Sequence, residues 1–76
     1  GLAAADADLF EALRALRKEL ADQHGVPPYV IFGDATLIQM SAEKPSNDEQ
    51  LLEITGVGEK KLERYGAVFL EAIANH

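Results

Sequence analysis

Residues Ile54 to Gly66 read ITGVGEKKLERYG, and this stretch decides the fold. One helical pattern ends at its start, and a second begins after its two closely spaced glycines. Gly56 and Gly58 are predicted to supply the positive φ and the close backbone approach that a tight turn between two helices requires. Val57 between them is expected to pack into the core. The stretch therefore predicts a helix-hairpin-helix-like turn.

The amides that open the second helix of this turn are expected to point outward, with the positive end of the helix dipole behind them. Together with Lys60 and Lys61 one turn away, Gly56 and Gly58 form a candidate phosphate cradle. Glu59 works against this role, because it places a carboxylate in the first turn of the same helix. The alternative is a plain αα-hairpin, since any short connection between packed helices favours glycine.

Upstream of the turn, apolar residues at helical spacing predict a first helix from about residue 8 to residue 24. Asp8 followed by Glu11 fits a capping box at the start of this helix. Gly25 supplies its stop, because glycine adopts the left-handed conformation that commonly ends helices.

Three shorter helical segments are predicted between the first helix and the hairpin. Pro28 can open a short turn, because proline suits the first position of a helix. Asp34 is the candidate N-cap of a helix that fades before Pro45, and Ser46 with Glu49 repeats the capping-box spacing for the next helix. No segment alternates with the period of a strand. The predicted fold class is all-α, a compact bundle of five short helices.

The last helix carries one apolar face, made of Leu62, Tyr65, Phe69 and Ile73. Gly66 inside this helix costs about 1 kcal/mol relative to alanine. We therefore expect close packing of another helix at Gly66.

The composition limits the function. The chain has 76 residues, a hydrophobic fraction of 47% and no cysteine, which predicts one small domain without disulfides or thiolate sites. Residues 1–7 are predicted to be a linker or an expression remnant, and residues 8–76 the domain, monomeric when isolated. No apolar run approaches the roughly 20 residues that span a bilayer, so no membrane partner is expected. The formal net charge of −6 argues against strong nucleic-acid binding.

Catalytic chemistry is not indicated. The chain shows no Walker A loop, no metal-binding motif and no Ser/His/Asp spacing typical of a hydrolase. We therefore predict no catalytic residue, no metal site and no cofactor in this domain.

Three segments together resemble one known family: VPPYVIF at residues 26–32, DATL at residues 34–37, and GVGxxKLxxYG at residues 56–66. They resemble the HRDC (helicase and RNase D C-terminal) domain over almost the whole chain, and most of all the copy in bacterial RecQ helicases. The copy in RNase D-like nucleases is the alternative.

The resemblance implies an auxiliary five-helix domain at the C-terminus of an ATP-dependent 3′ to 5′ DNA helicase of repair and recombination. ATP and magnesium would then bind to the motor, outside this chain. It also implies a cytoplasmic protein that acts on the bacterial chromosome. Some members of the family bind single-stranded DNA weakly, and others serve protein contacts or regulation.

Nine residues are candidates for contact with nucleic acid. Arg14 and Lys18 form a like-charge pair four residues apart, which disfavours a helix slightly and so points to another role. Tyr29 follows two prolines, where a ring can stack on an unstacked base. The full set is Arg14, Arg17, Lys18, Tyr29, Gly56, Gly58, Lys60, Lys61 and Arg64. The alternatives are an ordinary solvated face for the cations and a gap-filling ring for Tyr29.

Two functional hypotheses follow. The first is a weak module for single-stranded DNA that uses the basic residues and Tyr29. The second is a docking or regulatory module that contacts the helicase core or another basic protein through its acidic residues, without binding DNA.

Overall fold

The computed structural model describes residues 5–76 and contains five helices in this range. They are α1 (Ala7–His24), α2 (Pro28–Ile31), α3 (Asp34–Glu43), α4 (Asp48–Leu52) and α5 (Glu59–Ala74). The described residues contain no strand, and the predicted all-α class is confirmed. Most of residues 1–7 lies outside the described range, so the domain boundary at residue 8 stays a prediction.

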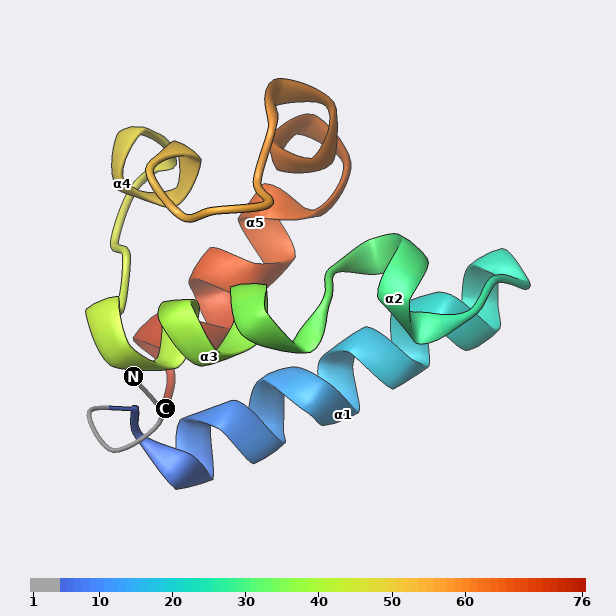
Figure 1. The fold of residues 1–76 in the computed structure, drawn as a ribbon, viewed down its shortest axis with the longest axis horizontal. Helices are drawn as coiled ribbons and strands as arrows, with labels where there is room; N and C mark the ends of the chain where they lie inside the picture. Colours follow the sequence, from blue (N-terminus) through green and yellow to red (C-terminus); the bar gives the residue numbers. More distant parts are fainter. Residues whose placement is uncertain (1–4) are drawn as a thin grey trace.

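The long helix α1 is the base of the bundle. It contacts α2, α3 and α5, while α4 packs on α5. Figure 1 shows α3 lying along α1 and α5 crossing behind α3. The centre contains three aromatic rings that meet edge to face, with Phe32 5.0 Å from Phe69 and 6.0 Å from Tyr65 between ring centroids. Phe32 and Phe69 are both buried, and Phe69 lies on the apolar face that was predicted for the last helix.

The N-terminal cap of α1 is Asp6, and the predicted capping box at Asp8 is wrong. The Asp6 side chain accepts a hydrogen bond from the Leu9 amide at 3.0 Å. Its other carboxylate oxygen lies 3.2 Å from Lys44 Nζ, and its amide donates to the Ser41 carbonyl. These contacts with the end of α3 start the helix before Asp8. At the other end Gly25 has a φ of 66°, and the predicted stop is confirmed.

Two further caps lie one residue from their predicted positions. Gly33 is the N-cap of α3, and Asp34 is its first residue. Asn47 caps α4 by accepting a hydrogen bond from the Gln50 amide at 2.9 Å, and the predicted capping box of Ser46 and Glu49 is wrong. The Ser46 amide instead donates to the Gln50 side chain. An asparagine oxygen is as good an acceptor as serine, so the local spacing did not choose between them.

The two hairpin glycines have different roles. Gly56 has a φ of 94°, as predicted, and its backbone lies against Thr36 on α3, whose hydroxyl donates to the Thr55 carbonyl at 2.8 Å. Gly58 has a φ of −98° and open space around it, so its predicted positive φ is wrong. It is the N-cap of α5. Val57 between them is buried, as expected.

Close packing at Gly66 is confirmed. A Cβ at this position would lie 2.7 Å from Leu62 Cδ1 and 3.6 Å from Leu51 Cδ2 on α4. The missing side chain therefore leaves room for Leu62 on α5 itself, while Leu51 of α4 lies at ordinary contact distance.

Gly56→Ala is expected to lower the free energy of unfolding by about 1–3 kcal/mol, because alanine would hold a left-handed conformation and meet Thr36. Gly58→Ala is the matched control and should cost less than about 1 kcal/mol, since its φ suits any residue. Chemical denaturation measures both. Equal losses would contradict the different roles of the two glycines.

Hydrogen bonding to the Leu9 amide, and then the contact with Lys44, holds the pKa of Asp6 below its ordinary value. A lowered folded pKa means that the charged Asp6 stabilises the fold above its ordinary pKa, and that this stabilisation is lost as the pH falls through the lowered value. Asp6→Asn keeps the cap but cannot titrate. The difference in melting temperature between the wild type and this variant should therefore shrink as the pH falls below about 4. A constant difference would contradict the role of the charge.

Candidate nucleic-acid interface

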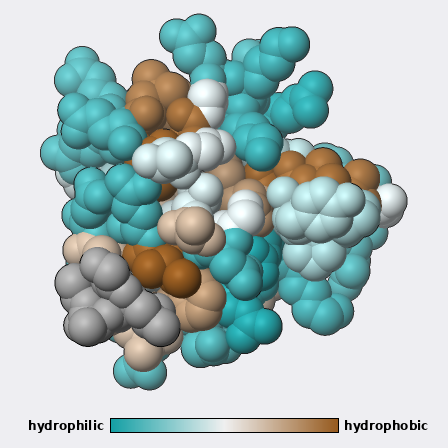
Figure 2. All heavy atoms as spheres, in the orientation of Figure 1, coloured by the Kyte–Doolittle hydropathy of each residue, from teal (hydrophilic) through white to brown (hydrophobic). Residues whose placement is uncertain are grey.

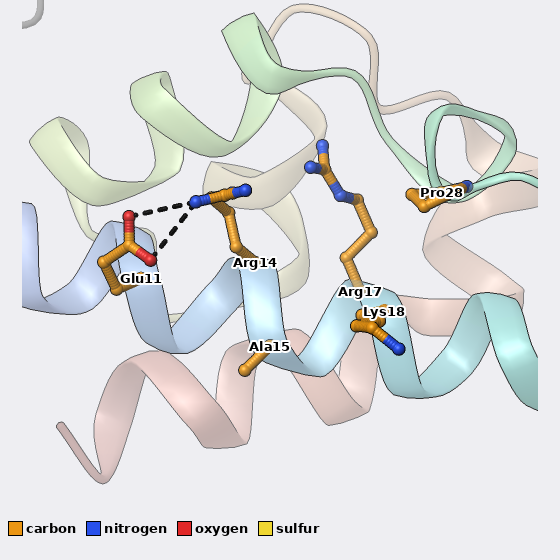
Figure 3. A pocket seen from close by; sticks show the side chains of 6 residues that line it. All are labelled: Glu11, Arg14, Ala15, Arg17, Lys18 and Pro28. Atoms are coloured by element: carbon orange, nitrogen blue, oxygen red, sulfur yellow. Dashed lines mark hydrogen bonds and ion pairs between the residues drawn. The ribbon is translucent and has the colours of Figure 1, made fainter.

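A shallow hollow between α1 and the start of α2 brings together part of the predicted basic set. It is lined by Glu11, Arg14, Ala15, Arg17, Lys18 and Pro28. Figure 3 shows the α1 side chains rising from one helix, with Pro28 on the far side of the hollow. Two of its three cations, Arg14 and Lys18, are exposed.

Arg17 points into the bundle. The residue is 8% exposed, and its Nη1 donates to the Phe32 carbonyl at 3.1 Å and lies 2.8 Å from Asp34 Oδ1. Figure 3 shows this side chain directed away from α1 towards the chain that follows α2. Because Nη1 is held by two groups that follow α2, Arg17 joins α1 to the connection between α2 and α3.

Sequence spacing contained a signal for this internal role. The buried residues of α1 are Leu9, Leu13, Arg17 and Ala21, each four residues after the last. This spacing defines one face of a helix. The charge of Arg17 suggested a surface position, although its place in the stripe indicated the core.

Arg14 and Lys18 are held only loosely. Arg14 Nη1 lies 3.2 Å from Glu11 Oε1, and Lys18 Nζ lies 3.1 Å from Asp22 Oδ2. All four side chains are at least half exposed. Exposed pairs of this kind contribute about 0–1 kcal/mol, so a phosphate can displace the acids at small cost.

Tyr29 lies on the surface of α2 and is 72% exposed. Its neighbours Ile31 and Phe32 are buried, because α2 is a single turn and only one side of it faces the core. The exposure favours a stacking role for Tyr29 over a gap-filling one.

The basic residues of the hairpin do not form a built phosphate site. Lys61 is half-buried, with its Nζ 5.6 Å from the centre of the Phe32 ring, while Lys60 and Arg64 are exposed. Glu59 occupies the first turn of α5, where a phosphate would bind. Among residues 5–76, no three His, Asp or Glu side chains are placed to hold a metal ion. No helix in the same range is long and apolar enough to cross a membrane.

A five-helix bundle with a glycine hairpin before its last helix defines a small accessory module. The profile of the HRDC domain matches residues 6–73, and the chain belongs to this family. One solved relative, D. radiodurans RecQ HRDC domain 3, superimposes with a TM-score of 0.87 at 45% identity, over 91% of each chain.

Similar proteins include bacterial helicases. The chain is 54% identical over 66 residues to the ATP-dependent DNA helicase RecQ of Bacillus subtilis, which covers 87% of this chain and 11% of that protein. It is 47% identical over 76 residues to the ATP-dependent DNA helicase RecQ of Haemophilus influenzae, which covers 100% of this chain and 12% of that protein. The chain thus spans about a tenth of the length of these relatives.

Arg17→Met should lower the free energy of unfolding by about 1.5–3 kcal/mol, because it removes a charged hydrogen bond and leaves the Phe32 carbonyl without a donor. Arg14→Met is the matched control, because it is the same substitution at an exposed position of the same helix. It should change the free energy of unfolding by less than about 0.5 kcal/mol. Thermal unfolding measures both variants. If Arg17→Met left the free energy of unfolding unchanged, the internal role of Arg17 would be contradicted.

Proposed function

We propose that this chain is the auxiliary HRDC domain of a RecQ-type ATP-dependent 3′ to 5′ DNA helicase in the bacterial cytoplasm. The identities to two RecQ helicases support this proposal over an RNase D-like nuclease. The bound nucleotide and magnesium would belong to the motor, which lies outside this chain. Repair and recombination of the chromosome are the processes in which such a helicase would act.

Within this helicase the domain binds single-stranded DNA weakly. The observation that carries the proposal is the exposed Tyr29 ring, on the helix that borders the hollow with Arg14 and Lys18. We expect a strand with a base stacked on Tyr29 to contact these cations through its phosphates, and stacking contributes about 1–3 kcal/mol per base. Lys60, Lys61 and Arg64 add positive charge on α5. Arg17, Gly56 and Gly58 support the fold rather than contact the strand.

Overall charge keeps the binding weak. The chain carries a formal net charge of −6, and long-range repulsion slows the approach of a polyanion. The affinity should therefore be micromolar or weaker at low salt. A protein-docking role without DNA binding is the second candidate, and the acidic surface of α4 and α5 favours it.

Tyr29→Ala should weaken binding of a fluorescent oligothymidylate by about 1–3 kcal/mol without changing the melting temperature, since the ring is exposed. Val30→Ala, on the same turn and 40% exposed, is the matched control and should leave affinity unchanged. Tyr29→Phe keeps a stacking face and should bind like the wild type. Fluorescence anisotropy at low salt measures all three.

Salt dependence tests the electrostatic part of the same binding. If Arg14 and Lys18 neutralise two phosphates, the logarithm of the binding constant should fall with the logarithm of the salt concentration with a slope near −1.4. This slope follows from about −0.7 per phosphate on a single strand. Binding without salt dependence would overturn the role of these cations, and no binding at all would leave docking as the function.

A further inference from the structure

A groove lies between α4 and α5, and none of Arg14, Lys18 and Tyr29 lines it, although the cations Lys60, Lys61 and Arg64 lie on the same helix α5. Its lining combines three apolar residues with three acids: Leu52, Leu62, Ala67, Asp48, Glu59 and Glu63. Figure 2 shows apolar surface at the top of the view, where α4 and α5 face each other in Figure 1, with hydrophilic side chains on both sides.

The apolar part of the groove, its floor, lies where α4 packs on α5. The Leu62 side chain lies over Gly66, which has no side chain to displace it, and Leu51 of α4 lies at ordinary contact distance from the same glycine. Leu51 is fully buried, and its neighbour Leu52 is 38% exposed beside the groove.

The acids at the groove are not held in ion pairs. Among residues 5–76, none of Asp48, Glu59 and Glu63 forms an ion pair. Glu59 and Glu63 lie four residues apart on α5, which is a spacing that disfavours a helix slightly when the charges are alike. A cationic partner would relieve this repulsion.

We propose that the groove docks a basic amphipathic helix of a partner protein. An apolar side chain of that helix would lie on Leu52 and Leu62, as in other helix-in-groove complexes. Lysines or arginines one turn apart on the partner would have the spacing of Glu59 and Glu63. The three carboxylates repel phosphate, which favours a cationic partner over nucleic acid as the occupant. This inference deepens the protein-docking candidate of the proposed function and does not depend on DNA binding.

The probe is a labelled helical peptide of about 18 residues, with leucines in one stripe and lysines elsewhere, titrated by anisotropy into the 76-residue chain. Glu63→Gln should weaken its binding about two- to fivefold, the loss of one exposed ion pair. Glu19→Gln is the matched control, an exposed acid on α1 without an ion pair in residues 5–76, and should have no effect. Equal effects of the two variants would mean unspecific attraction and overturn the proposal.

The apolar floor is tested separately. Leu52→Ser should weaken the peptide about three- to tenfold, because a leucine contact is lost. Val68→Ser is its control, since Val68 is 37% exposed but does not line the groove. A peptide with alanine in place of leucine should bind more weakly to the wild type. If Leu52→Ser and Val68→Ser bind the peptide with equal affinity, the groove is not the docking site.

Two more measurements separate the alternatives. Tyr29→Ala should bind the peptide like the wild type, so failure of the DNA proposal and failure of this one are distinguishable. Analytical ultracentrifugation of the free chain should show a monomer. A dimer that Glu63→Gln dissociates would identify a second copy as the occupant and overturn the proposal of a separate partner.

Discussion

The rest of the structure depends on the contact between Arg17 and the chain around Phe32. Burying a guanidinium is costly unless its donors are paired; here Nη1 meets both the Phe32 carbonyl and Asp34, whereas the buried Nε has no hydrogen-bond partner among residues 5–76. Phe32 is extended between α2 and α3, so its carbonyl cannot be satisfied within a helix. One side chain therefore joins α1 to the beginning of α3 and places the Phe32 ring against α5.

The same contact determines what α2 shows to solvent. The turn is held between the left-handed Gly25 and the extended Phe32. With Ile31 and Phe32 directed inward, Tyr29 and Val30 are left outside. An exposed aromatic ring is thus a consequence of how the core is closed, and it is available for recognition without loss of stability.

The hollow on α1 and the groove of α4 and α5 differ in the charges that line them. The exposed cations Arg14 and Lys18 lie on α1, whereas Asp48, Glu59 and Glu63 surround the groove of α4 and α5. A net charge of −6 makes the acidic face the stronger source of long-range field. An accessory domain with two such faces can contact a strand weakly on one side and a basic protein on the other.

Sequence alone determined the all-α class, the stop at Gly25, the short turn opened by Pro28 and the hairpin with Gly56, because each rests on a local backbone preference. Tertiary structure decided the caps, since Asp6 is held by groups at the end of α3 that are distant in sequence. It also decided the interior place of Arg17, whose partners follow α2. The groove could not be foreseen, because its floor is formed by side chains of two helices whose approach depends on long-range packing.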